Sequence, residues 1–285
     1  MKVFLMTVAM VLSMFTSCVI TQDRIVPSAN YETKPVKVER FDGIATSTSI
    51  DVIYNQTSGS QHVEIYAPDN LMEYIKVQVE DGILRVGICS EGNKGIMING
   101  KHQTIVRVLA PAVHSFQASS SGNILLKNGL QTTGKVSMKS SSSGDIEGGN
   151  VVCDELEAHA SSSGDVTLQK LDCRSLYADA NSSGDVEIKW LTANEVQADA
   201  SSSGDVIIAE GTCEHAEFDA SSSGDVVAKG LKATHVTASA SSAGDISCYP
   251  IESLKSKVSS SGNIGYRGEP KFIDFSPKNG LHKLD

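Results

Sequence analysis

The sequence predicts an all-β protein, a right-handed single-stranded parallel β-helix (β-solenoid) with about 20 residues per coil in its C-terminal half. Three observations lead to this prediction. A serine-glycine phrase recurs at nearly constant spacing, apolar residues alternate in the period of a strand, and helical periodicity is almost absent. Aromatic residues make up only 5% of the chain, so we expect a narrow core of small and aliphatic side chains.

The repeated phrase consists of a serine cluster, a glycine, Asp or Asn, and then Ile or Val. Its glycines are Gly122, Gly144, Gly164, Gly184, Gly204, Gly224, Gly244 and Gly262, which lie 22, 20, 20, 20, 20, 20 and 18 residues apart. A strand pattern with this period makes each repeat one coil of a solenoid, in which equivalent residues stack ~4.8 Å apart. Parallel β crossovers are overwhelmingly right-handed, which gives the predicted hand.

Three columns of the aligned repeats are predicted to line the interior. Ile or Val stands two residues after each glycine, mostly Ala stands four before it, and Cys or Ala stands nine after it in the regular coils. The serine two residues before each glycine has the same inward parity, so its hydroxyl is expected to bond within the corner. Glycine is expected at the corner because a Cβ would clash there or because φ must be positive.

The N-terminus has the composition of a targeting segment. Lys2 precedes an almost continuously apolar stretch, residues 3–15, which is too short to cross a bilayer and fits the core of a signal peptide. Phe15-Thr16-Ser17-Cys18 resembles a bacterial lipobox, in which the cysteine thiol takes a diacylglyceryl group. Residues 1–17 are therefore predicted to be a lipoprotein-type signal peptide. Cys18 is predicted to carry the lipid, with palmitate as one of its acyl chains. An ordinary secreted signal peptide is the alternative.

The mature chain is predicted to be one elongated domain behind a tether. Residues 18–35 are polar and contain Pro27 and Pro35, which indicates an irregular tether. Residues 36–115 alternate in the strand period, with a hairpin-type turn signal at Asp81-Gly82, and are predicted to be N-terminal β coils of the same domain. Residues 116–285 are predicted to be the regular β-helix coils and a C-terminal cap.

The charge balance excludes several partners. The chain has 24 basic and 34 acidic residues, and removal of Lys2 with the signal peptide leaves 23 against 34, a net charge near −11. Such a chain is not expected to bind nucleic acid. Residues 95–101 have the spacing of a phosphate loop, but His102 stands where Ser or Thr should hold magnesium, so no nucleotide is expected. No catalytic residue and no cofactor are assigned.

Candidate binding residues lie where the repeat loses its symmetry. Eleven residues after their glycines, Glu195, His215 and His235 are predicted to form one outward row ~4.8 Å apart. These side chains suit zinc, nickel or copper, but stacked ligands do not surround a metal tetrahedrally, so a solvated polar face is favoured and no metal site is assigned. Tyr177 and Trp190 are expected to be exposed and could stack on a sugar, although single exposed aromatic residues are common.

Two further columns leave alternatives open. The aspartates that follow the glycines repel one another, and the repulsion is offset either by backbone N–H groups of the aspartate's own corner, which we favour, or by bridging calcium. They are Asp145, Asp165, Asp185, Asp205, Asp225 and Asp245, with Asn123 and Asn263 at the two ends. Cys153 and Cys173 lie on adjacent coils near disulfide distance, but buried free thiols are favoured because alanine shares their column.

The ensemble of phrases resembles a known family. Phe41-Asp42-Gly43-Ile44, Ile50-Asp51-Val52, the stretch 77–84 and the Ser-Ser-Gly series are similar to the "putative auto-transporter adhesin, head GIN domain" family over about residues 36–270. The resemblance implies a right-handed β-helix on secreted or lipid-anchored bacterial proteins, many from Bacteroidetes. It brings no catalytic motif that could be transferred to this chain.

The function expected from these observations is a non-enzymatic cell-envelope lipoprotein that acts as an adhesion or scaffold module on a rigid rod. It would be held at the bacterial outer membrane, on the surface or the periplasmic face, by the lipid on Cys18, and a glycan or a protein would be its ligand. The alternatives are a polysaccharide-active β-helix enzyme and a purely structural envelope protein. Enzymes of that kind break the repeat with long insertions, whereas coils 144–244 contain none.

Overall fold

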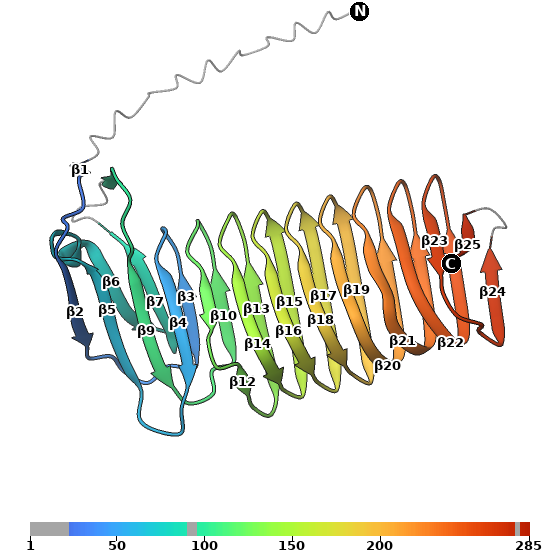
Figure 1. The fold of residues 1–285 in the computed structure, drawn as a ribbon, viewed down its shortest axis with the longest axis horizontal. Helices are drawn as coiled ribbons and strands as arrows, with labels where there is room; N and C mark the ends of the chain where they lie inside the picture. The colour runs from blue at the N-terminus through green and yellow to red at the C-terminus, as the bar shows by residue number, and fades with distance from the viewer. Residues whose placement is uncertain (1–22, 90–95, 277–279) are drawn as a thin grey trace, which may run out of the picture.

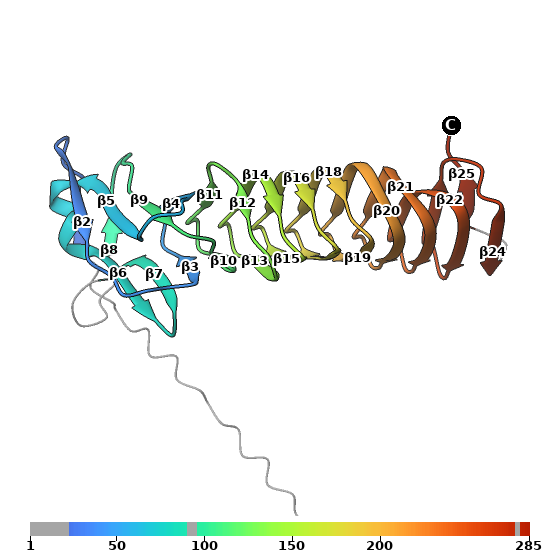
Figure 2. The same cartoon turned by 90° about the horizontal axis from the view of Figure 1, so that it is seen from below.

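The protein is a long rod with a wider N-terminal end, as Figures 1 and 2 show in two perpendicular views. The computed structural model describes residues 23–89, 96–276 and 280–285. The expected signal peptide (1–17), Cys18 and the first residues of the expected tether lie outside the described residues. Within the described ranges, no helix is long and apolar enough to cross a membrane.

The regular part of the rod is built from parallel coils of about 20 residues, as predicted. Each coil contributes to two stacks of strands, and one coil contributes two short strands, Ile124–Leu126 and Leu130–Gln131, to the same stack. One stack contains β10 (Ser115–Ala118), β13 (Lys135–Ser140), β15 (Glu155–Ser162), β17 (Ser175–Ser182) and β19 (Glu195–Ser202). The other contains β11 (Ile124–Leu126), β12 (Leu130–Gln131), β14 (Ile146–Val152), β16 (Val166–Asp172) and β18 (Val186–Thr192). The register advances by one repeat per coil, for example Val166 to Val186 and Ala178 to Ala198.

Towards the C-terminus the two strands of a coil merge into one long bent strand. These strands are β20 (Val206–Ala220), β21 (Val226–Ala240) and β22 (Asp245–Val258). The rod ends with β23 (Asn263–Tyr266), β24 (Phe272–Ser276) and β25 (Leu281–Lys283), all parallel to their neighbours. The repeat therefore runs to the end of the chain with shortened strands.

The N-terminal region departs from the prediction of simple coils over residues 36–115. Its elements are β1 (Asp23–Ile25), β2 (Tyr31–Val36), β3 (Gly43–Thr46), β4 (Asp51–Gln56), β5 (His62–Pro68), the 3₁₀ helix η1 (Asp69–Tyr74), β6 (Ile75–Glu80), β7 (Ile83–Ile88), β8 (Ile96–Ile98) and β9 (Ile105–Ala110). Strands β3 and β4 continue the two stacks, against β10 and β11. The pairs β2–β5, β5–β9 and β6–β7 are antiparallel.

A tight turn produces one of the three antiparallel pairs, β6–β7. Asp81 and Gly82 both adopt positive φ, 51° and 75°, which reverses the chain between β6 and β7. The interpretation of residues 18–35 as an irregular tether also fails where the structure describes them. Residues 23–25 pair with β8, and β2 pairs with β5 along its whole length.

The predicted interior columns are buried. The Ile and Val side chains two residues after the glycines are between 0% and 2% exposed, and Cys153, Cys173 and Cys213 are between 5% and 7% exposed. The alanine column is also buried, with Ser140 as its polar member at 3% exposure. Ser140 donates to the Gly164 carbonyl at 2.9 Å, so its hydroxyl is satisfied inside the tube.

The corner serines correct one prediction. The serine two residues before each glycine is exposed, not inward, and it adopts a φ between 53° and 64°. The corner glycines themselves are there because there is no room for a side chain. A Cβ on Gly204 would lie 2.7 Å from the Asn181 nitrogen and 2.7 Å from the Gly184 oxygen of the preceding coil. Counting alternate residues predicted the wrong side for these serines, because a residue in the left-handed conformation interrupts the inward–outward alternation of the strand.

Candidate functional site

The face formed by β13, β15, β17, β19, β20 and β21 carries three parallel rows of outward side chains. Row A contains Lys135, Glu155, Ser175, Glu195, His215 and His235; row B contains Ser137, Glu157, Tyr177, Gln197, Glu217 and Thr237; row C contains Lys139, His159, Asp179, Asp199, Asp219 and Ser239. The rows exist because alternate residues of a strand point to the same side and the coils are in register. We call this surface the three-row face.

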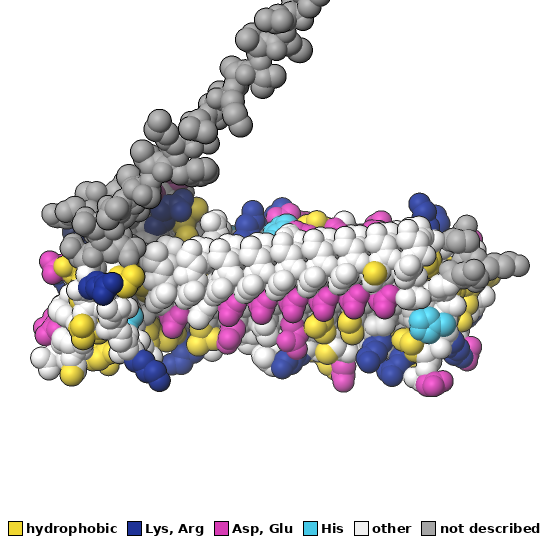
Figure 3. Space-filling view, turned by 90° about the horizontal axis from the view of Figure 1, so that it is seen from above, with side chains coloured by type: hydrophobic (Ala, Val, Ile, Leu, Met, Phe, Trp, Pro, Cys, Tyr) yellow, Lys and Arg dark blue, Asp and Glu magenta, His cyan; other side chains and the backbone are white. Residues whose placement is uncertain are grey.

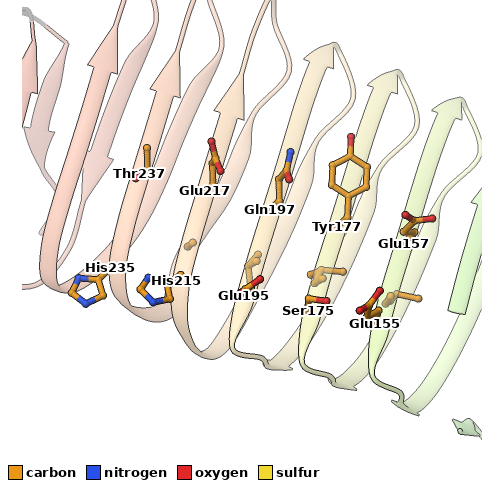
Figure 4. A pocket seen from close by; sticks show the side chains of 14 residues that line it. Glu155, Glu157, Ser175, Tyr177, Glu195, Gln197, His215, Glu217, His235 and Thr237 are labelled. Atoms are coloured by element: carbon orange, nitrogen blue, oxygen red, sulfur yellow. The ribbon is translucent and has the colours of Figure 1, made fainter. Parts of the chain in front are cut away.

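Rows A and B line an open hollow of about 400 Å³ (Figure 4). Glutamates dominate its polar lining. Lys135 pairs with Glu157 at 2.5 Å, and Arg174 pairs with Glu155. Within the described residues, no Lys, Arg or His lies within 4.0 Å of the Glu195 or Glu217 carboxylate. The hollow therefore has neutralised carboxylates at one end and uncompensated ones in the middle.

Row C also changes from basic to acidic side chains along the rod. The Tyr177 hydroxyl donates to the Asp199 carboxylate, and burial together with this bond raises the pKa of Tyr177 to about 12, so the hydroxyl stays protonated. Burial is the main cause of the raised pKa of Asp199, and the nearby charges of Asp219 and Asp179 add to it. Asp179 lies 3.2 Å from the Nδ1 atom of His159.

A second hollow, of about 490 Å³, lies where the rod meets the N-terminal region. Its charged lining is cationic, with Arg85, Lys139 and His159 on β7, β13 and β15. The remaining lining is mainly serine and threonine hydroxyls. The three-row face is thus positive towards the N-terminal end and negative across β17, β19 and β20.

The candidate metal residues stack as the spacing predicts. Glu195 is in register with His215, and His215 with His235. The two imidazole rings stack at 5.1 Å between centroids and 17° between planes, and His235 Nδ1 lies 2.9 Å from Ser253 Oγ. Among the described residues, no group of three His, Cys, Asp or Glu side chains converges as it would around a metal. The stacked rings lie side by side along the face (Figure 4).

The aspartate ladder corrects a second detail. The five carboxylates from Asp145 to Asp225 each accept a backbone N–H group, but this group belongs to the aspartate of the next coil and not to the acceptor's own corner. Asp165 N donates to Asp145 Oδ1 at 3.0 Å, and the same bond recurs up to Asp245 N with Asp225 Oδ1. The series begins at Asp51, whose Oδ1 accepts from Asn123 N at 3.3 Å, and continues from Asn123 Oδ1 to Asp145 N. Asn263 ends it through its side-chain amide nitrogen, which donates to Asp245. Figure 3 shows a row of acidic side chains along the rod beside a band of small side chains.

The cysteine and aromatic candidates lie as follows. Cys153 and Cys173 are buried free thiols, and burial raises their pKa values to about 11 and about 12. Tyr177 is half-buried on the three-row face, whereas Trp190 is 45% exposed on β18 in the other stack. The two aromatic rings therefore do not form one sugar platform.

One polar cluster was missed in the sequence. His114 lies 2.7 Å from Asp42 Oδ1 through Nδ1 and 2.9 Å from Thr132 Oγ1 through Nε2. The Thr132 hydroxyl also has the Thr133 carbonyl as an acceptor, at 3.1 Å. The cluster joins the start of β3, the start of β10 and the turn before β13. Its members are far apart in the sequence, and no repeat column contains all three.

The sequence comparison decides the family. The family described as "Putative auto-transporter adhesin, head GIN domain" matches residues 40–209 and 167–270. The chain belongs to this family. A comparison with curated proteins finds no match.

Solved structures share the fold of this head GIN domain protein. A protein titled a putative adhesin from Parabacteroides merdae has a TM-score of 0.68 at 19% identity, covering 92% of this chain and 100% of its own. A protein titled a putative lipid binding protein from Parabacteroides distasonis has a TM-score of 0.61 at 22% identity, with coverage of 92% and 100%. A protein titled a putative adhesin from Bacteroides fragilis has a TM-score of 0.50 at 26% identity, with coverage of 91% and 95%.

Proposed function

We propose that this chain is a non-enzymatic adhesion module of the bacterial outer membrane, held there by a lipid on Cys18, with the rod carrying the binding surface. The observation that supports adhesion is the three-row face on a stiff rod. Its side chains stand on strands whose spacing is fixed by neighbouring coils, so the surface is preorganised for a ligand. Family membership supports an envelope role in the same direction.

The enzyme alternative finds less support in the geometry. A polysaccharide-active site needs walls that close around the sugar chain, and such walls come from long loops between coils. The hollow on the three-row face is lined by strand residues of β15, β17, β19, β20 and β21. It is open along the rod, which suits the contact of one surface with another better than the enclosure of a substrate.

The anchoring part of the proposal is tested by Cys18→Ala. The substituted protein should leave the membrane fraction for the soluble fraction, because the protein part then has no acyl chains to partition into the bilayer. Fractionation followed by immunoblotting measures this, and a cysteine outside the lipobox, in the variant Cys89→Ala, is the matched control. Membrane association that survives Cys18→Ala would show that the anchor is elsewhere.

The adhesion part is tested in cells that lack the protein. Attachment to host or bacterial surfaces should fall in the deletion strain and return with the wild-type chain, but not with Cys18→Ala secreted in equal amount. A purely structural envelope protein predicts unchanged attachment and an altered envelope. Purified protein on arrays of glycans and extracellular proteins then identifies the class of ligand.

A further inference from the structure

The charges of the three-row face are arranged so that the face is complementary to itself. Row C runs, along the rod, from Lys139 and His159 to Asp179 and Asp199. Row A runs in the same direction from Lys135 to Glu195. Consider a line along the strand direction between β15 and β17. In row A, Lys135 and Glu195 are equally far from this line, and in row C the same is true of Lys139 and Asp199.

We propose that a second copy of this chain docks on the three-row face, with the two rods antiparallel and a two-fold axis between β15 and β17. This axis lies in the interface and runs along the strands, so each row faces the same row of the other copy in reverse order. Lys135 then faces Glu195, Lys139 faces Asp199, and each of these pairs occurs twice. The inference goes beyond the proposed function, because it names a second copy of this chain as the binding partner. This contact does not depend on the lipid anchor or on a ligand from outside.

The rest of the face follows the same symmetry. His159 faces Asp179, and Glu157 faces Tyr177, whose hydroxyl donates its proton to Asp199 of the same copy. One coil further out, Gln117 faces Asp219, since Gln117 precedes Lys139 in row C. Lys135 and Lys139 of the other copy therefore meet Glu195 and Asp199, and Glu195 is one of the two uncompensated carboxylates in the middle of the hollow.

Other arrangements of the two rods bring like charges together. A parallel arrangement places row A against row C, so that Lys135 faces Lys139 and Glu195 faces Asp199. Moving the axis of the antiparallel arrangement to β17 makes Asp179 face its own copy and Glu155 face Glu195. Like-charge contacts of this kind oppose association, so the face selects one orientation and one register.

The size of the patch fits a weak and reversible contact. Six coils at ~4.8 Å and five-residue strand segments at ~3.3 Å per residue cover roughly 500 Å² per copy. The total of about 1,000 Å² is at the lower limit for a specific interface. Many such contacts between two crowded surfaces would act together, so a weak pair is sufficient for cells that carry the protein to adhere to one another.

The test uses purified protein in the Cys18→Ala background, which removes any lipid from the comparison, and measures mass by sedimentation equilibrium. The unmodified face should give a reversible dimer. Lys135→Glu/Lys139→Glu and Glu195→Lys/Asp199→Lys should each be monomeric, because each places like charges in both copies of the two contacts. An equimolar mixture of the two variants should dimerise again, because each reversed half then meets its opposite.

Two controls make the outcome unambiguous. Lys170→Glu/Lys189→Glu changes the same charge on exposed residues of β16 and β18, and should leave the dimer unchanged. Dimerisation of the mixture also proves that both variants are folded. A monomeric parent protein, or variants that stay dimeric on their own, would overturn the proposal. A mixture that stays monomeric while both variants melt like the parent would overturn it as well.

Discussion

At the corners of the repeated coils, a serine adopts the left-handed backbone conformation. The glycine two residues later occupies a position that has no room for a side chain. The serines have φ near 60°, which a non-glycine residue adopts only at a cost in free energy of about 1 kcal/mol or more. The glycines lie against the backbone of the preceding coil, where a methyl group has no space. The two residues thus have separate physical reasons for being at the corner.

This separation predicts a position-specific effect of alanine. Gly204→Ala should lower the free energy of unfolding by about 3 kcal/mol, because its Cβ would meet backbone atoms that cannot move aside. Gly149→Ala is the matched control: nothing lies within 4 Å of its Cβ, so a change of less than about 0.5 kcal/mol is expected. Denaturant unfolding followed by circular dichroism measures both. Equal effects would contradict the steric explanation.

The sequence predicts some residues well and others poorly, for identifiable reasons. The column that contains Val166 and Val186 was predicted correctly because it depends only on the period and on strand alternation. Ser162 was placed inward because a residue with positive φ cannot be recognised from its parity. The acceptor role of the aspartates was predicted, but the donor was misplaced, since bonds between coils depend on how one corner sits on the next.

Among the elements of the rod, the aspartate ladder couples each coil to the next through a carboxylate and a backbone N–H. At Asp165 and Asp205, this bond favours the ionised carboxylate and lowers its pKa, whereas partial burial and the neighbouring aspartates raise it. For Asp165 and Asp205, burial is the largest effect, and their pKa values are raised above the ordinary value. The ladder is therefore held together by hydrogen bonds against the repulsion of its charges.

The ladder predicts how stability changes with pH. A carboxyl group whose pKa is higher in the folded state binds protons more tightly when folded, so its contribution to stability falls as the pH rises through that pKa. Between the ordinary pKa of aspartate and the raised values of Asp165 and Asp205, the melting midpoint should therefore rise as the pH is lowered. Asp165→Asn/Asp205→Asn should reduce this slope, because asparagine keeps the acceptor oxygen and does not titrate. Calorimetric melts of both proteins across this range, with chelator present, provide the measurement; the same slope in both would refute the explanation.

The N-terminal elements show what the sequence could not reveal. The turn signal at Asp81-Gly82 correctly predicted the reversal between β6 and β7. The pairing of β2 with β5 joins residues about thirty positions apart and has no repeat to mark it. The three-row face could be predicted in part, since the stacking of Glu195 with His215 follows from the period. Its two hollows and the ion pairs depend on side-chain packing that periodicity does not contain.

As a whole molecule, the rod behaves as a one-dimensional stack in which each coil contacts its neighbours. β17, for instance, pairs with β15 on one side and β19 on the other. Stability in such a stack is close to a sum of contributions from single coils and from the interfaces between them. The number of coils can then change while the fold stays the same, provided that the register of the columns is kept.

Removal of one coil tests this view. Deletion of residues 185–204 joins Gly184 to Asp205 and restores the repeated phrase, so the protein should keep a cooperative thermal transition with a slightly lower midpoint. Deletion of residues 185–194 removes half a coil and moves the next serine-glycine corner to the opposite side of the tube, so the coils after it should lose protection from hydrogen exchange. Similar protection in the two deletions would argue against independent coils.

The antiparallel pairing of β2 with β5 has a mechanical consequence. If a force along the strand direction pulls on the chain before Tyr31, it reaches the folded part through β1, which pairs with β8, and then through β2. The ladder between Tyr31–Pro68 and Val36–Val63 is then loaded in shear, so its hydrogen bonds share the force instead of opening one after another. The β2–β5 ladder is thus suited to bear tension that acts along its strands.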